Sequence, residues 1–195
     1  PVDVTKFMAT RLKEESGAGW VDAPVSGGTE GAEAGTLAIM AGGTDIDIIK
    51  IKTVMETLAS NFTVFGDVGS GQVAKMVNQV LVLNNYAIIA EALALAEAGG
   101  IDVAKIPEAL ATGHAGSNLL PVLFPRMANR DFEPRGRARQ ILKDFDSLHE
   151  FAKTLKTPTP MSAQATSLFR MLIARGSGEL DGTSILKLYE QNANN

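Results

Sequence analysis

Apolar and polar residues follow two different periods along the first 66 positions. Helical spacing of the apolar positions predicts helices over residues 2–15 and 45–60. Short apolar runs bounded by turn residues predict strands within 20–26, 35–43 and 62–66. Strands that alternate with helices predict a mostly parallel, helix-covered sheet. The pattern in 45–60 directs one set of side chains inward: Ile48, Ile49, Ile51, Val54, Met55 and Leu58.

The pattern is helical throughout after Gly69. Residues 70–98 are predicted to form one long helix that ends at Gly99 and Gly100. Shorter helical segments follow at 102–113 (with Asp102 as N-cap), 117–130 (kinked or broken by two prolines), 138–156, 161–176 and 183–191. In 138–156 the predicted inward residues are Ile141, Leu142, Phe145, Leu148, Phe151, Ala152 and Leu155.

The change of pattern divides the chain near residue 67. Residues 1–67 form a small α/β part, and residues 68–195 form an all-α part. A sheet of three strands is too narrow for a free-standing doubly wound domain. We therefore interpret residues 1–67 as the remnant of a larger Rossmann-type sheet. The first residue is Pro1 and not Met. We therefore expect the chain to start inside a longer gene product.

Composition narrows the class of partner. The 195 residues carry a net charge of −4, which does not suggest a nucleic-acid partner. The absence of cysteine excludes disulfides and thiolate chemistry and fits a cytoplasmic location. The segment 76–98 is strongly apolar, but its six amide and acidic side chains make a membrane span unfavourable. We interpret it as the central helix of a helical domain.

The segment "GSGQVA", Gly69 to Ala74, matches the glycine pattern that binds dinucleotide pyrophosphates. That pattern requires a second strand with an acidic residue at its end, about twenty positions further on. Glu91 has the right spacing but lies inside the predicted helix 70–98. The context of the motif is therefore wrong, and we interpret the segment as the start of a helix.

Lys75 lies close to the N-terminus of that helix. The positive end of a helix dipole disfavours an ammonium group and should lower the pKa of this lysine. Asn78 and Gln79 lie three and four residues further on, on about the same helical face. A lysine beside an amide is suited to proton transfer to or from a substrate oxygen. A solvated lysine at a helix start is the alternative.

Two other segments can carry chemistry. Ser26, Gly27 and Gly28 can present a hydroxyl and backbone N–H groups to a carboxylate, or can form a simple tight turn. Lys143 and Asp144 are adjacent on a predicted helix and can equally be a surface pair of little energetic value. His114 and His149 have no companions at metal-ligand spacing, so we predict no metal site.

Three motifs in order resemble the β-hydroxyacid dehydrogenase family, which includes 3-hydroxyisobutyrate dehydrogenase, tartronate semialdehyde reductase and, more distantly, 6-phosphogluconate dehydrogenase. "DAPVSGGTEGAEAGTLAIMAGG" is similar to the family's substrate-binding signature, and "GDVGSGQVAKMVNQ" to its catalytic-lysine signature. "LKDFD" followed by "PTPMSAQATSLF" is similar to its C-terminal pattern. The resemblance covers nearly the whole chain.

The resemblance implies an NAD- or NADP-dependent oxidoreductase that transfers a hydride between nicotinamide and a small 3-hydroxy acid or semialdehyde. Residues 1–67 would be the C-terminal part of the dinucleotide-binding domain, and residues 68–195 an all-α substrate and dimerisation domain like that of 6-phosphogluconate dehydrogenase.

The resemblance also assigns roles to the candidate residues. Lys75 would be the general acid/base, and Asn78 would position the reacting oxygen. Ser26, Gly27 and Gly28 would bind the substrate carboxylate. Gln79 would also lie at the substrate and, in place of a second asparagine, favours the tartronate semialdehyde reductases. Lys143 would approach the cofactor, and Asp144 would orient the Lys143 side chain.

The family's main dinucleotide-binding half has no counterpart in these residues. We therefore expect the chain alone to bind NAD(P) poorly and to be inactive. The family also forms dimers or tetramers through the helical domain, so we expect a homodimer or homotetramer, a small carboxylate substrate, and neither a nucleic-acid nor a membrane partner.

Two alternatives remain open at the level of sequence. The chain could be a non-catalytic, dehydrogenase-like module for oligomerisation or binding, although such a module has no need for Ser26, Lys75, Asn78 and Lys143 together. Alternatively, Lys75 could form a Schiff base with a carbonyl substrate, as in aldolases.

Overall fold

The computed structural model describes residues 2–190, so Pro1 and the last residue of the predicted helical segment 183–191 lie outside it. The chain forms two compact units, and the division falls between Asn78 and Gln79. This division lies inside one continuous helix, α4 (Ser70–Ala98). The domain boundary predicted at residue 67 lies eleven positions earlier than Asn78.

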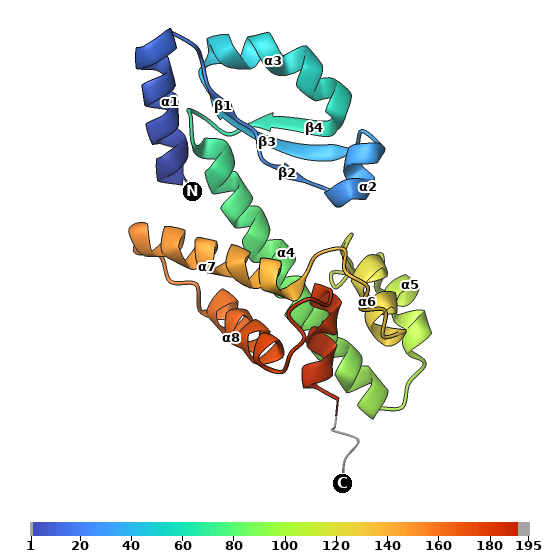
Figure 1. The fold of residues 1–195 in the computed structure, drawn as a ribbon. Helices are drawn as coiled ribbons and strands as arrows, with labels where there is room; N and C mark the ends of the chain where they lie inside the picture. Colours follow the sequence, from blue (N-terminus) through green and yellow to red (C-terminus); the bar gives the residue numbers. More distant parts are fainter. Residues whose placement is uncertain (1, 191–195) are drawn as a thin grey trace. The chain divides into compact units, whose positions relative to one another are not determined.

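The first unit is an α/β arrangement (Figure 1). Besides the start of α4, its elements are α1 (Val2–Ser16), β1 (Val21–Asp22), β2 (Val25–Ser26), α2 (Gly28–Glu33), β3 (Leu37–Gly43), α3 (Asp45–Leu58) and β4 (Ala59–Val64). The central strand is β3, whose side chains are almost all buried. The helix α3 packs against β3 and β4, and connects them.

The sheet is mixed, so the prediction of a mostly parallel sheet is wrong. Among the strands of residues 2–190, only β3 and β4 pair in parallel, whereas β1 and β2 both pair with β3 in antiparallel fashion. Connection length explains the difference. Parallel neighbours need a crossover of a dozen or more residues, which α3 supplies between β3 and β4. The connection from β2 to β3 holds only the six-residue helix α2, so the chain turns straight back.

The inward side chains predicted for residues 45–60 are only partly correct. Ile48 is buried, and Ile51 and Met55 are half-buried, but Ile49, Val54 and Leu58 are exposed. A sheet in which β1 and β2 have two residues each offers little surface for the helix to cover. The last two residues of the predicted helix, Ala59 and Ser60, belong to β4.

The second unit is helical (Figure 1). Besides the remainder of α4, its elements are η1 (Val103–Lys105), α5 (Ile106–Leu110), α6 (Leu120–Ala128), α7 (Ala138–Thr154), α8 (Pro160–Ala174) and η2 (Gly182–Leu188). The helices α7 and α8 pack side by side, and η2 contacts both of them and α6. The predicted bounds of the long helix, 70–98, are confirmed.

Local signals fix several helix ends. The predicted cap at Asp102 is confirmed, because its side chain accepts a hydrogen bond from the Ala104 backbone N–H at 3.2 Å. The break that two prolines predicted within 117–130 is not found, because α6 runs without interruption from Leu120 to Ala128. Pro121 stands at the start of that helix, where its missing N–H costs nothing, and Pro125 lies inside it.

Aromatic rings form the core of the second unit. Phe124, Phe145 and Phe169 are fully buried, and the centroids of the Phe145 and Phe169 rings lie 5.8 Å apart. Tyr86 of α4 meets the Phe169 ring edge-on at 6.5 Å. Such pairs stabilise a core beyond the area that they bury. Of the inward residues predicted for 138–156, only Leu155 is exposed.

A buried ion pair closes the same unit. The carboxylate of Asp181 accepts a hydrogen bond from Arg126 Nη1 at 3.1 Å and others from the backbone N–H groups of Arg135 and Gly136. Burial of a carboxylate is tolerated when such donors surround it. The loop before α7 is thereby held against η2.

Helix α4 is long and apolar enough to cross a membrane by length and composition, and a third of its most apolar window is buried. Core helices of soluble proteins pass the same test, so this property alone assigns no membrane role. The polar residue Asn84 on this helix donates hydrogen bonds to Val80 O and to Ser162 Oγ of α8.

Candidate active site

A first cluster of predicted site residues forms in the first unit. Lys75 Nζ donates hydrogen bonds to the backbone oxygen of Val25 at 2.8 Å and to Asn78 Oδ1 at 3.2 Å. Asn78 Nδ2 in turn donates to Ser26 Oγ at 3.3 Å. The predicted common face of Lys75 and Asn78 is confirmed. The fold therefore connects a lysine, an amide and a hydroxyl from two segments about fifty residues apart.

The short strand β2 and the turn after it position Ser26. Pairing with β3 fixes Val25 and Ser26, and the chain then turns at Gly27 and Gly28, whose φ values are 130° and 65°. Such φ values favour glycine. A Cβ atom on Gly28 would meet nothing within 4 Å, so the backbone at this point faces open space. A ligand can therefore approach the peptide groups beside Ser26.

Asp22 is a positioning residue of the candidate site that the sequence did not single out. Its buried carboxylate, only 5% exposed, accepts hydrogen bonds from the backbone N–H groups of Gly69 at 2.6 Å and Gln72 at 2.9 Å. These are donors that the start of a helix leaves without intrahelical partners. Asp22 thus attaches the N-terminus of α4 to β1 and sets where the helical turn that carries Lys75 lies relative to the sheet.

The contacts of Asp22 and β3 also explain Gly71 of "GSGQVA". A Cβ atom on Gly71 would collide with Met40 O and would lie 2.8 Å from the Asp22 carboxylate. Glycine is therefore required here for close packing of helix and strand. The N–H groups of Gly69 and Gln72 are already bonded to Asp22, and that of Ser70 to Asp67 O, in agreement with the interpretation of this segment as a helix start. A carboxylate inside the apolar strand segment 20–26 was the available signal for such a role.

A second cluster lies in the second unit, between α4 and α7. The buried side chain of Gln79 donates a hydrogen bond through Nε2 to Asp144 Oδ2 at 2.9 Å. The other oxygen of Asp144 lies 3.1 Å from Lys143 Nζ, and the Lys143 side chain is 74% exposed. The three residues therefore form a chain from a buried amide to an exposed ammonium.

Neither histidine belongs to a metal site in the described part of the chain, where no group of three or more potential ligands is found. His149 lies between two threonine hydroxyls, with Nε2 2.8 Å from Thr166 Oγ1 and Nδ1 3.2 Å from Thr159 Oγ1. These contacts hold α7 against α8. His114 is exposed in the loop after α5.

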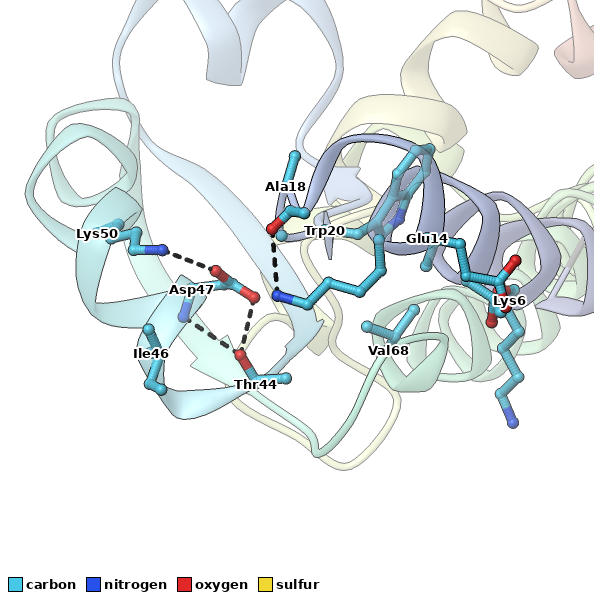
Figure 2. Close-up of a pocket in the computed structure, with 14 residues that line it drawn as sticks. Lys6, Glu14, Ala18, Trp20, Thr44, Ile46, Asp47, Lys50 and Val68 are labelled. Carbon is cyan, nitrogen blue, oxygen red and sulfur yellow. Dashed lines mark hydrogen bonds and ion pairs between the residues drawn. The ribbon is translucent and has the colours of Figure 1, made fainter.

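A cavity of about 750 Å³ lies elsewhere in the first unit, beside α1 and the start of α3 (Figure 2). None of the predicted site residues lines it. Thr44 and Lys50 donate hydrogen bonds to the Asp47 carboxylate, and these bonds lower the pKa of Asp47. These lining groups are therefore already hydrogen-bonded to one another. The cavity is separate from the Lys75 cluster.

Two family models match the chain. Residues 69–189 match the family described as "NAD-binding of NADP-dependent 3-hydroxyisobutyrate dehydrogenase". Residues 2–66 match the "NAD binding domain of 6-phosphogluconate dehydrogenase". Together they cover both units and support NAD or NADP as the cofactor.

Individual relatives of the chain are also dehydrogenases and reductases by name. The chain is 36% identical over 194 residues to 2-hydroxy-3-oxopropionate reductase of Escherichia coli, covering 100% of the chain and 66% of that protein. It is 35% identical over 197 residues to the NAD-dependent L-serine dehydrogenase of Pseudomonas aeruginosa, with 97% and 65% covered.

A crystal structure of 3-hydroxyisobutyrate dehydrogenase from Salmonella typhimurium superimposes with a TM-score of 0.87 at 27% identity, covering 96% of this chain and 66% of that one. The chain thus belongs to the β-hydroxyacid dehydrogenase family. It spans about two thirds of the length of these relatives.

The residues described here fit NAD or NADP only in part. The glycine segment that resembles a pyrophosphate site is bonded to Asp22, so it does not fit. The exposed ammonium of Lys143, 3.1 Å from the Asp144 carboxylate, does fit a polar or anionic portion of such a cofactor.

Proposed function

We propose that this chain carries the proton-transfer and substrate-binding groups of an NAD(P)-dependent 3-hydroxyacid dehydrogenase or semialdehyde reductase. The observation that carries the proposal is the hydrogen-bonded series Lys75, Asn78 and Ser26 at the start of α4. Family membership supports the reaction class. The geometry supports the role of each residue.

Lys75 acts as the general acid/base. Two acceptors, Val25 O and Asn78 Oδ1, fix its ammonium group at the first turns of α4. A fixed ammonium can give a proton to a carbonyl oxygen during reduction, and the amine can take it back during oxidation. Asn78 maintains this orientation through its oxygen, while its amide nitrogen binds Ser26.

Ser26, Gly27 and Gly28 bind the substrate carboxylate. The open space beside Gly28 lets the carboxylate approach the backbone, and the Ser26 hydroxyl supplies a directed hydrogen bond. The substrate carboxylate thus binds at Ser26 and the reacting oxygen at Lys75, and Asn78 is hydrogen-bonded to both of these residues.

Lys143 approaches the cofactor, and Asp144 orients the Lys143 side chain. Gln79, assigned to the substrate from sequence, supports this arrangement through its bond to Asp144. The nicotinamide, when bound, supplies or accepts the hydride. The residues of this chain supply position and charge.

The substrate is a small 3-hydroxy acid or semialdehyde of the tartronate semialdehyde or 3-hydroxyisobutyrate type. The similarity to 2-hydroxy-3-oxopropionate reductase and the presence of Gln79 favour the former. We further propose that the chain alone is inactive, and that the protein assembles as a homodimer or homotetramer through the helical unit.

The proposal is tested by following the hydride. The chain is joined to the amino-terminal dinucleotide-binding half that its relatives carry, and it is given NADPH or NADH deuterated at C4 with tartronate semialdehyde. Deuterium is expected on the former carbonyl carbon. A borohydride-trapped adduct on Lys75 would instead show Schiff-base chemistry, and no turnover with bound cofactor would favour a non-catalytic module.

The inactivity of the chain alone has its own measurement. Fluorescence titration of the 195-residue chain with NADH and NADPH should show no saturable binding. Saturable binding together with turnover would contradict this part of the proposal without affecting the role of Lys75.

A further inference from the structure

The N-terminus of α4 carries a buried counter-charge. Both oxygens of the Asp22 side chain accept hydrogen bonds, one from the Gly69 N–H and one from the Gln72 N–H, as those of an ionised carboxylate do. The free N–H groups of a helix start are equivalent to a charge of about +0.5, whereas a carboxylate carries a full negative charge. The charge at this end of α4 is therefore negative on balance, and not positive as the helix alone would make it.

Lys75 lies one turn beyond this carboxylate. It follows Gln72 by three residues, so the two share a face of α4. Long side chains on a helix point back toward its N-terminus, and Lys75 Nζ accordingly reaches the backbone oxygen of Val25, which follows Asp22 closely in the chain. The second group bonded to Lys75 Nζ, Asn78 Oδ1, is also an acceptor. Both acceptors and the nearby carboxylate favour the ammonium form of Lys75.

Other charged residues lie on the elements next to Asp22 and Lys75, and all of them are exposed. They are Asp3 and Lys6 of α1, Glu30 and Glu33 of α2, and Asp67 of the segment before α4. The strand β3, which packs against the first turn of α4, has no charged residue. Water and salt screen exposed charges much more strongly than a buried charge. Asp22, only 5% exposed, therefore sets the sign of the charge beside this turn.

We propose that Asp22 keeps Lys75 protonated, so that the resting site presents an acid to a carbonyl oxygen. Asp22 acts through Lys75 and is a positioning residue. The inference rests on the proposed function for the reaction that this proton serves. The amine that takes a proton from a hydroxyl group then forms only at more alkaline pH.

Competitive acetylation of the 195-residue chain tests the proposal without turnover. A trace of acetic anhydride labels only unprotonated amines, and mass spectrometry follows the labelling of Lys75 and of the exposed Lys156 as the pH rises. Labelling of Lys75 should reach half its maximum at a pH no lower than that for Lys156. A half-maximum at lower pH would show that the helix dipole prevails, and would overturn the proposal.

A charge-removing variant tests the role of Asp22 itself. Asp22→Asn retains one oxygen acceptor and should move the half-maximum for Lys75 to lower pH. The matched control Asp67→Asn removes an exposed carboxylate just before the same helix and should leave the half-maximum unchanged. Circular dichroism verifies that both variants fold. If Asp22→Asn does not fold, the comparison of Lys75 with Lys156 in the wild-type chain still decides. Equal half-maxima for the wild type and a folded Asp22→Asn variant would overturn the proposal.

The consequence for the reaction is measured separately. In the chain joined to a dinucleotide-binding half, the rate of carbonyl reduction should fall as the pH rises and Lys75 loses its proton. Asp22→Asn should move this fall to lower pH, and a fall at the same pH in both proteins would contradict the inference. If Asp22→Asn shifts the acetylation of Lys75 but Lys75→Ala retains activity, the proposed role of Lys75 is refuted while its control by Asp22 is confirmed.

Discussion

The two units use their amphipathic helices differently. In the second unit, α7 and α8 bury their apolar faces, and Phe145 and Phe169 are completely buried. In the first unit, α1 carries an apolar row with equally regular spacing, yet Phe7 is 60% exposed and its neighbours Val4 and Met8 are exposed as well. The same sequence pattern therefore leads to a packed core in one unit and to an open surface in the other.

The difference shows that amphipathic spacing specifies a helix but not its partner. In the second unit α7, α8 and η2 pack against one another, so the apolar faces of α7 and α8 are largely buried. The first unit has one small mixed sheet, which covers a single stripe of α3. It also contains a buried Trp20 indole nitrogen that has no hydrogen-bond partner among residues 2–190.

The largest expected effect comes from a matched pair of phenylalanines. Phe169→Ala should lower the free energy of unfolding of the second unit by about 3–5 kcal/mol, because it leaves a cavity in the core. Phe7→Ala should change stability by less than about 0.5 kcal/mol, because its ring is exposed. Urea unfolding followed by circular dichroism measures both. Equal effects of the two substitutions would remove the contrast between the units.

The first unit should nevertheless depend strongly on one polar contact. Asp22→Ala leaves the N–H groups of Gly69 and Gln72 without their acceptor, and should cost about 1–3 kcal/mol. The single tryptophan, Trp20, lies in this unit, so its fluorescence reports the transition. The control Glu56→Ala removes only a long surface pair with Lys52 and should have little effect. If Asp22→Ala behaved like the control, the attachment of α4 to β1 would be unimportant.

The core of the second unit should also be sensitive to alkaline pH. Burial, followed by the nearby Asp181 carboxylate, raises the pKa of Tyr86 from 10.0 to about 12. Because the folded state retains this proton more tightly, the contribution is fully present below pH 10 and is lost as the pH rises through about 12. Tyr86→Phe removes the ionisation, so its stability should fall less between these pH values. Parallel curves for the two proteins would show that Tyr86 does not titrate in this way.

The smallest expected change concerns Gln79. Gln79→Leu removes the bond to Asp144 at a cost of about 0.5–1.5 kcal/mol. Asp144 should then orient Lys143 less well, and the Lys143 amine should react faster with a methylating reagent, as measured by mass spectrometry. Lys153, on the same helix α7, provides the internal reference. An unchanged ratio of the two reaction rates would separate Gln79 from the positioning of Lys143.

Local patterns were sufficient for much of the fold. The apolar run and terminal glycines predicted α4 with its observed bounds, and Asp102 predicted the cap of η1. The pairing directions of β1 and β2 were not predictable in the same way, since two-residue strands have too little pattern to show direction. Their pairing depends on the length of the connections and on contact with β3.

The candidate site likewise combines contacts that local sequence predicts with contacts that depend on the tertiary fold. Helical spacing was enough to place Asn78 beside Lys75, because residues three apart share a face. The contacts of Asn78 with Ser26 and of Gln79 with Asp144 join segments more than fifty residues apart. The role of the Asp22 carboxylate could not be predicted from its position in an apolar strand. Only the tertiary fold reveals that helix N–H groups face it.

The central claim is that Lys75 transfers the proton, and one variant tests it most directly. In the chain joined to a dinucleotide-binding half, Lys75→Ala should lower kcat about 10²–10⁴-fold without weakening NADPH binding, and added methylamine should restore part of the rate. The control Lys52→Ala, which removes an exposed lysine on α3, should retain full activity. Full activity of Lys75→Ala would contradict the account.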